Sequence, residues 1–166
     1  MEDGYIKRRV LTPEQAYVKI RHYCAFQERT HQEVKTKLAG YGITWQQASE
    51  MLSRLIEENF LNEERFAKSF AGGKFRIKGW GRKKIEAELK KRFVSDYSIR
   101  KAIREEIPQE EYEKMAMKLI EKKWNALKSP DDTEFVKQSK TRQYLFMRGY
   151  ENDVITRVMK LFLCKD

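Results

Sequence analysis

Long hydrophobic runs are missing from this sequence of 166 residues, 36% of which are charged. No stretch approaches the roughly 18 consecutive apolar residues that a membrane-spanning helix requires. The first residues, MEDGYIKRRVLTPEQ, also lack the apolar core and the small-residue cleavage site of a secretory signal peptide. These absences predict a soluble, cytoplasmic protein with no membrane partner.

Cysteine and histidine are scarce, and the whole inventory is His22, Cys24, His31 and Cys164. Two distant cysteines do not make the disulfide framework of a small secreted domain, so we expect reduced thiols. A zinc site needs about four ligands at characteristic spacings, so we predict no metal. Residues two apart on a helix point to different faces, which argues against a nucleophile and base at His22 and Cys24.

Motifs for nucleotide binding and catalysis are also missing. A P-loop needs G-x-x-x-x-G-K-[ST], but the nearest segment, AGGKFRIKGWGRKK, has Phe where the Mg²⁺-binding hydroxyl belongs. The pattern G-x-G-x-x-G fails after Gly79 and Gly81, and neither G-x-S-x-G nor H-E-x-x-H occurs. The sequence therefore predicts no enzymatic activity and no cofactor.

Apolar residues recur at helical spacing along nearly the whole chain, and no segment alternates as a strand does. Capping boxes are expected at Thr30 with Glu33 and at Thr44 with Gln47. Further N-caps are expected at Asn62, Ser95 and Asp132. Breaks that divide the chain into about nine helices are expected at Gly40 and Gly42, Gly72 and Gly73, Gly79 and Gly81, Pro108, Ser129 with Pro130, and Gly149.

Three segments align with one another: KLAGYGITWQQASEML, ELKKRFVSDYSIRKAI and YLFMRGYENDVITRVM. Leu38, Leu89 and Leu145 coincide in this alignment, at spacings of 51 and 56 residues. Such periods indicate a tandem array, and units this small must stack on their neighbours. The predicted fold is all-α, with three tandem three-helix repeats forming an elongated, curved array. The expected parts are an N-terminal segment at 1–12 and repeats at 13–60, 61–107 and 108–166.

The net charge of +10 is concentrated in the second predicted repeat, where 61–107 hold 14 basic and 7 acidic side chains. Such a patch suits a polyanion or an acidic protein surface, although a charge run can also be a solvated helix face. Phe75 and Trp80 lie among these cations, where aromatic faces can stack on bases or belong to the core.

The run FLNEERFAKSFAGGKFRIKGWGRKKIEAELKKRFV, residues 60–94, closely resembles the signature of the RecX family of bacterial recombination regulators. ERTHQEVKTKLAGYGI and YLFMRGYENDVITRVM resemble its first and third units, so the resemblance extends over about 13–163. Phe75 and Phe93 stand where the family often has a basic residue and a glycine. The positions that carry the central signature are Leu61, Asn62, Glu63, Glu64, Arg65, Phe66, Ala67, Phe70, Arg76, Lys78, Gly79, Gly81, Arg82, Lys84, Ile85, Glu88 and Leu89.

The resemblance implies a non-enzymatic regulator that binds the RecA filament on single-stranded DNA. Such a regulator inhibits ATPase and strand exchange, and so modulates recombinational repair and the SOS response. It further implies weak, electrostatic binding to single-stranded DNA, and we expect a monomer. The residues expected to contact RecA or DNA are Arg65, Lys74, Arg76, Lys78, Trp80, Arg82, Lys83, Lys84, Lys91 and Arg92.

Two other functions stay open at this point, a helix-turn-helix-like transcription regulator and an adaptor that binds only protein. The candidate recognition helix GRKKIEAELKKRF has little Asn or Gln for reading adenine, which disfavours the first. Arg65 could instead pair with a nearby carboxylate. Gly79 and Gly81 are expected to serve turn geometry, and Cys24 is expected in the core.

Overall fold

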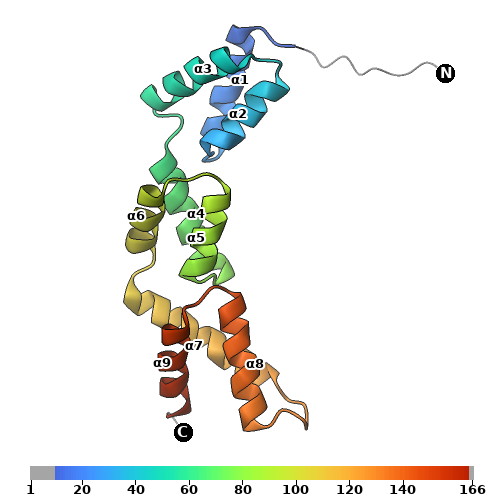
Figure 1. Ribbon diagram of the computed structural model, residues 1–166, viewed down its shortest axis with the longest axis vertical. Helices are drawn as coiled ribbons and strands as arrows, with labels where there is room; N and C mark the ends of the chain where they lie inside the picture. Colours follow the sequence, from blue (N-terminus) through green and yellow to red (C-terminus); the bar gives the residue numbers. More distant parts are fainter. Residues whose placement is uncertain (1–9, 165–166) are drawn as a thin grey trace, which may run out of the picture. The chain divides into compact units, whose positions relative to one another are not determined.

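The computed structural model describes residues 10–164, and within that range the chain forms nine α-helices and no strand (Figure 1). The all-α prediction is confirmed. Residues 1–9 of the predicted N-terminal segment lie outside the described residues. The helices are α1 (Pro13–Phe26), α2 (His31–Gly40), α3 (Trp45–Glu57), α4 (Glu63–Lys78), α5 (Arg82–Lys91), α6 (Asp96–Glu106), α7 (Gln109–Ala126), α8 (Glu134–Met147) and α9 (Asn152–Leu163).

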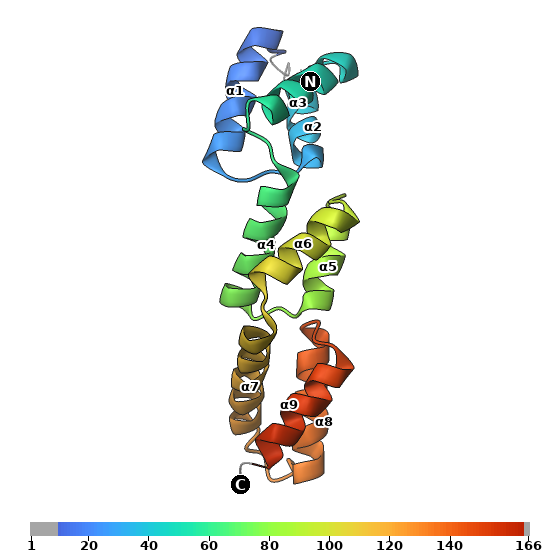
Figure 2. The same ribbon diagram turned by 90° about the vertical axis from the view of Figure 1, so that its left-hand side faces the viewer.

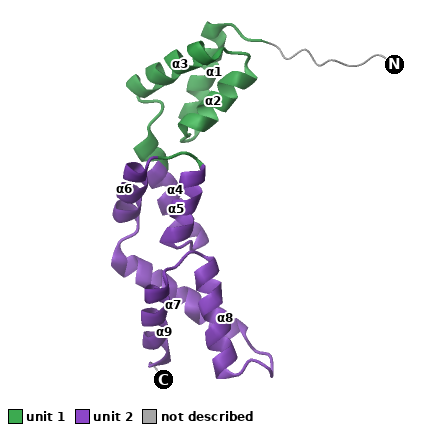
Figure 3. Ribbon diagram, viewed as in Figure 1, with its two compact units in different colours: residues 1–66, 92–94 green, residues 67–91, 95–166 purple. Residues whose placement is uncertain are grey.

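The chain separates into two compact units (Figure 3). Unit 1 comprises residues 1–66 and 92–94, and unit 2 comprises residues 67–91 and 95–166. Helices α1 to α3 lie in unit 1, whereas most of α4 and the helices α5 to α9 lie in unit 2. The predicted repeat boundaries and the curvature of the array stay predictions.

Side-chain caps explain where most of the helices begin. Thr30 accepts a hydrogen bond from the amide of Glu33, whose carboxylate accepts one from the amide of Thr30 at 2.7 Å. Thr44 forms the same kind of box, as predicted, and Thr12 begins α1 in this way too. The N-cap predicted at Asp132 is wrong, because Thr133 caps α8. Asp132 instead accepts from the amide of Ser129 and pairs with Lys140.

The second helix of a repeat ends in a recurring turn, which explains part of the sequence alignment. The amide of Ile43 donates to the carbonyl of Leu38 at 3.2 Å, and that of Tyr150 donates to Leu145 at 3.1 Å. These are the long hydrogen bonds of a Schellman motif, whose preceding residue is left-handed. The residues with positive φ at this position of the three aligned segments are Gly42 (78°), Phe93 (59°) and Gly149 (90°).

The break predicted at Gly72 and Gly73 is wrong, because both residues lie inside α4. Helices tolerate glycine at a cost of about 0.5–1 kcal/mol relative to alanine. A Cβ on Gly72 would lie 2.6 Å from a carboxylate oxygen of Glu106, which pairs with Arg76 across α4 and α6. Gly72 therefore makes room for a contact between two helices rather than ending one.

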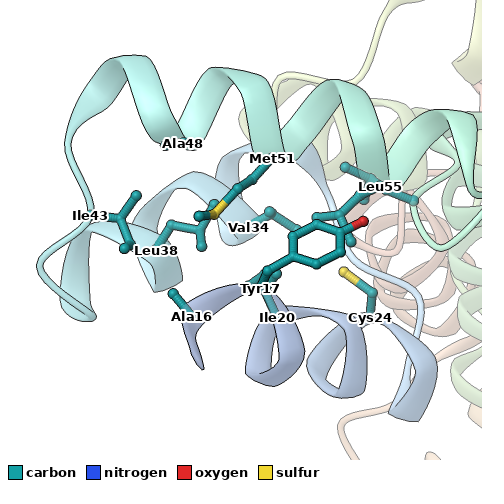
Figure 4. Packing of buried hydrophobic residues seen from close by; sticks show 11 residues of the cluster. Ala16, Tyr17, Ile20, Cys24, Val34, Leu38, Ile43, Ala48, Met51 and Leu55 are labelled. Atoms are coloured by element: carbon teal, nitrogen blue, oxygen red, sulfur yellow. The ribbon is translucent and has the colours of Figure 1, made fainter. Parts of the chain in front are cut away.

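The core of unit 1 gathers side chains from α1, α2 and α3 (Figure 4). Ile20, Val34, Leu38 and Leu55 are fully buried there, and each would contribute about 1.5–3 kcal/mol through burial. Cys24 lies in the same core with 5% of its surface exposed, which confirms its predicted place. Burial raises the pKa of its thiol to about 11.

In unit 2, α8 and α9 both pack against α7, and α5 packs against α6 (Figures 1 and 2). The helix pair α4 and α6 is bridged by Lys68 with Glu105 and by Arg76 with Glu106. No helix between residues 10 and 164 combines the length and apolar character that crossing a bilayer requires.

Candidate functional site

A left-handed glycine ends α4 and turns the chain back over that helix. Gly79 has φ 64°, and its amide donates to the carbonyl of Phe75 at 3.0 Å. This single bond is that of an αL cap, and the amide of Trp80 donates further back along the helix, to the carbonyl of Lys74 at 3.1 Å. The turn geometry predicted for Gly79 is confirmed, and it brings Trp80 to the face of α4 that carries Lys74.

Trp80 is the centre of a cluster of aromatic rings and ammonium groups. Its ring meets Phe70 edge to face, with centroids 6.4 Å apart at 69°. The Nζ atoms of Lys74 and Lys84 lie 4.9 Å and 4.5 Å from the centre of the indole. Each such contact contributes about 0.5–1 kcal/mol at an exposed site. We call Phe70, Lys74, Trp80 and Lys84 the tryptophan cluster; it joins α4, the turn and α5.

Four lysines, two in this cluster and two near it in sequence, keep their charge available. Lys78 and Lys83 are exposed, and Lys74 and Lys84 are half-buried. Within residues 10–164 none of the four has a carboxylate partner in an ion pair. An uncompensated group of cations around an aromatic ring suits phosphates with bases, or an acidic protein surface.

Arg82, which the sequence placed among the contacts, is held inside unit 2 instead. Its guanidinium donates to the carbonyl of Ile107 at 2.9 Å and to the side chain of Gln109 at 3.0 Å. It also lies 4.2 Å from the ring centre of Tyr112. The side chain lines a surface groove of about 490 Å³ together with Ile103. Arg82 therefore ties α5 to the start of α7.

The other predicted contacts are spread out and largely paired. Arg76 pairs with Glu106, and Lys91 pairs with Glu88. Arg65 and Arg92 belong to unit 1. The Arg65 guanidinium bonds to the carboxylate of Glu28 and to both oxygens of Asn59. Arg65 is therefore paired with a carboxylate, as weighed from sequence, but its partner lies 37 residues away and not beside it in the chain. Of the ten predicted contacts, the structure thus brings together Lys74, Trp80 and Lys84, leaves Lys78 and Lys83 exposed near them in sequence, and engages the other five in separate interactions.

Gly81 has a role other than the turn geometry expected of it, because its φ is not positive. Its amide donates to the carbonyl of Arg148 at 2.7 Å, and the amide of Lys83 donates to Gly149 at 3.0 Å. A Cβ on Gly81 would overlap the carbonyl of Gly149 and lie 2.5 Å from the amide nitrogen of Tyr150. The glycine allows two backbones to touch.

The same contact joins the two motifs that carried the family resemblance. Arg148 donates to the carbonyl of Lys78 at 2.6 Å, and the Tyr150 hydroxyl donates to the carbonyl of Gly79 at 3.3 Å. The Gly-x-Gly segment after α4 therefore meets the Arg-Gly-Tyr segment after α8. These interactions hold the turn that carries Trp80.

Tyr112 also takes part in this contact between the segment after α4 and the segment after α8, which we call the joint. Its ring is fully buried and stacks on Tyr150, with centroids 4.8 Å apart and planes 11° apart. Its hydroxyl donates to a carboxylate oxygen of Glu151 at 2.6 Å and accepts from the amide of Arg82 at 3.1 Å. Burial, and then the hydrogen bond to Glu151, raises the pKa of the phenol, so the group stays a neutral donor.

Sequence reasoning missed the cations that lie over aromatic rings outside the second repeat. Arg148 lies 4.6 Å from the ring centre of Tyr144, and Lys123 lies 5.4 Å from it. In unit 1, Lys37 lies over two tyrosines. A signal was present for one of these contacts, because Lys37 precedes Tyr41 by four residues, the spacing of neighbours on one helix face.

The fold and this surface define a class of protein: an all-α protein built from tandem three-helix repeats, with a cluster of basic and aromatic side chains. Comparison with known proteins agrees. The sequence model of "RecX, second three-helix domain" matches residues 62–103, and that of "RecX, third three-helix domain" matches residues 110–159.

Relatives with the same name extend the match. The chain is 34% identical over 124 residues to "Regulatory protein RecX" of Vibrio parahaemolyticus, which covers 75% of this chain and 76% of that protein. It is 29% identical over 132 residues to the protein of that name from Clostridium perfringens strain 13, covering 80% and 61% of the two chains. The chain spans only 54% of the Oceanobacillus iheyensis relative.

Solved structures show the same fold. The crystal structure of RecX from Lactobacillus salivarius superimposes with a TM-score of 0.82 at 25% identity, covering 90% of this chain and 96% of the other. The chain belongs to the RecX family, whose members named above are regulatory proteins.

Proposed function

We propose that this protein is a non-enzymatic regulator of the RecA recombinase. It binds the RecA filament on single-stranded DNA, lowers ATP hydrolysis and strand exchange, and so tunes recombinational repair and the SOS response. The observation that carries the proposal is the 34% identity to "Regulatory protein RecX" of Vibrio parahaemolyticus over three quarters of both chains.

The tryptophan cluster and the lysines beside it supply the contacts in this proposal. Lys74, Lys78, Lys83 and Lys84 face DNA phosphates or acidic RecA side chains, and Trp80 stacks on a base or anchors in a protein pocket. Each phosphate that a lysine neutralises on a single strand contributes about −0.7 to the slope of log K against log salt. In this proposal Arg82 does not contact DNA or RecA, because its guanidinium is bonded to Ile107 and Gln109 and ties α5 to the start of α7.

The first test is the ATPase rate of the cognate RecA on single-stranded DNA, titrated with this protein at two salt concentrations. We expect a fall at or below stoichiometric protein, with a weaker effect at high salt. An unchanged rate would refute the proposal. Tight, salt-dependent duplex binding in its place would favour the transcription regulator, and binding to protein alone would favour the adaptor.

Matched variants connect the activity to the surface. Lys78→Gln with Lys83→Gln removes two exposed charges that lie two and three residues from Trp80 in sequence. Lys118→Gln with Lys122→Gln removes two exposed charges, four residues apart on α7, which make no ion pair in the part of the chain that the structure describes. The first pair is expected to weaken inhibition several-fold, and the second to leave it at the wild-type level. Equal inhibition by both pairs would contradict the assigned surface.

A further inference from the structure

Helices α1 and α2 of unit 1 carry a second group of cations and aromatic rings that the proposed function does not use. Lys19 and Tyr23 are four residues apart on α1, and Lys37 and Tyr41 are four residues apart at the end of α2. Both tyrosines are half-buried, because one side of each ring packs against the unit 1 core.

The cations lie directly against the tyrosine rings. The Nζ atom of Lys37 is 5.2 Å from the ring centre of Tyr23 and 5.9 Å from that of Tyr41, so one ammonium group makes a cation–π contact with both rings. The Nζ atom of Lys19 is 6.0 Å from Tyr41. The guanidinium of Arg29 lies 3.9 Å from Tyr23 and donates to its carbonyl at 3.4 Å.

The charges and hydroxyls of this group remain available for a ligand. Within the described residues, Lys19 and Lys37 have no carboxylate in an ion pair, and neither tyrosine hydroxyl has a hydrogen-bond partner. Neither hydroxyl is buried without a partner, so both reach solvent. The nearest acid on α2, Glu33, is engaged by the amide of Thr30 in the capping box.

We propose that the α1–α2 face, formed by Lys19, Tyr23, Arg29, Lys37 and Tyr41, is a binding surface for single-stranded nucleic acid. Bases stack on the exposed part of the Tyr41 ring and on the Arg29 guanidinium that lies over Tyr23, and the two lysines contact the phosphates on either side. This surface lies in unit 1 and is additional to the tryptophan cluster.

The chemistry favours a single strand over the other polyanions in a cell. An acidic protein segment offers carboxylates to the cations, but it has no flat ring to cover the tyrosines. A duplex offers phosphates, but its bases are already stacked on one another. Only a single strand supplies unstacked π-faces together with a phosphate at each step. Stacking of this kind is tolerant of sequence, because every base has a face.

The experiment measures binding of the full chain to a fluorescein-labelled oligothymidylate of 20 nucleotides by anisotropy, without RecA, at several salt concentrations. Every protein compared carries Lys78→Gln and Lys83→Gln, so that the second repeat contributes little to binding of the oligonucleotide; the protein with these two changes alone is the background protein. Lys37→Gln is compared with Lys35→Gln, which removes the same charge from an exposed position of α2 that touches neither ring. A second variant, Tyr23→Leu with Tyr41→Leu, keeps the apolar packing and removes the stacking surface of Tyr41 and the ring beneath Arg29.

Lys37→Gln is expected to reduce the slope of log K against log salt by about 0.7, while Lys35→Gln leaves it unchanged. The double tyrosine variant is expected to lose at least ten-fold in affinity for the oligothymidylate. For an abasic oligonucleotide of equal length, the double tyrosine variant and the background protein are expected to have the same affinity. Thermal melting of each variant shows whether its fold is retained, and Lys37→Gln, at an exposed position, does not disturb the core.

Equal slopes for Lys37→Gln and Lys35→Gln would overturn the proposal, as would equal affinity for the oligothymidylate and the abasic strand. If Lys37→Gln and the double tyrosine variant lost binding to polyglutamate but bound the oligothymidylate as before, the surface would be assigned to an acidic protein. That result would also overturn the proposal. Because RecA is absent from these measurements, their failure leaves the proposed regulation of RecA to be judged separately by the ATPase titration.

Discussion

Replacement of Gly81 by alanine is expected to break the joint between the turn after α4 and the turn after α8. The added methyl group would overlap the carbonyl of Gly149 and approach the Tyr150 amide to 2.5 Å. Ordinary contacts of a Cβ lie at 3.4–4 Å, so the two backbones must separate by about 1 Å. Both partners are backbone, which cannot rotate away as a long side chain can.

The expected cost follows from the hydrogen bonds that this movement breaks. The bonds from Gly81 to Arg148 (2.7 Å) and from Lys83 to Gly149 (3.0 Å) are worth about 1 kcal/mol each. The backbone groups of Gly81 and Gly149, which are buried, lose their partners and add about 1 kcal/mol more. We therefore expect Gly81→Ala to lower the free energy of unfolding by about 3 kcal/mol.

Gly73→Ala is the matched control, because nothing lies within 4 Å of a Cβ built at this position inside α4. It is expected to raise the free energy of unfolding by about 0.5–1 kcal/mol. Urea unfolding followed by circular dichroism at 222 nm measures the difference. With a slope of about 2 kcal/mol/M, Gly81→Ala shifts the midpoint down by about 1.5 M. A midpoint for Gly81→Ala at or above that of Gly73→Ala would refute the reasoning.

Three further predictions concern single side chains. Phe93→Gly is expected to stabilise the protein by about 0.5 kcal/mol in urea unfolding, because relief of the left-handed φ of 59° exceeds the entropy cost of glycine. Phe93 is 78% exposed, so little buried surface is lost, and a lower midpoint would contradict the prediction. Tyr112→Phe is expected to cost about 2 kcal/mol by the same assay, since it removes the hydrogen bond to the Glu151 carboxylate; an unchanged midpoint would show that this bond contributes nothing. A disulfide reagent at pH 8 is expected to label the exposed Cys164 and spare Cys24, whose thiol pKa burial raises to about 11; two thiols reacting in the native protein would rule out the buried position of Cys24.

Local signals in the sequence predicted much of the fold. Thr30 and Thr44 with their partners three residues on mark helix starts, because the cap is made by neighbours in sequence. The recurring leucine revealed the repeat, and the structure shows a left-handed residue four positions after each of these leucines. Gly72 was misinterpreted because its reason for being glycine lies in the pairing of Arg76 with Glu106, 30 residues apart.

The candidate site was predicted less completely, because a list of cations does not tell which of them are already paired. Arg82 looks like its neighbours Lys83 and Lys84 in sequence, yet its partners at 107 and 109 come from the following helix junction. Arg65 likewise finds Glu28, 37 residues away. Lys91 pairs with Glu88 in its own helix, which the spacing of three residues could have indicated, whereas the partners of Arg82 and Arg65 follow only from the packing of the helices.

Binding to the RecA filament itself tests the central claim most directly. The protein is labelled at Cys164, and its anisotropy is followed while preformed filaments on single-stranded DNA are added. The account predicts saturable binding that is lost in Lys78→Glu with Lys83→Glu and kept in Lys118→Glu with Lys122→Glu. Absence of binding by the wild-type protein, or equal loss in both double variants, would contradict it.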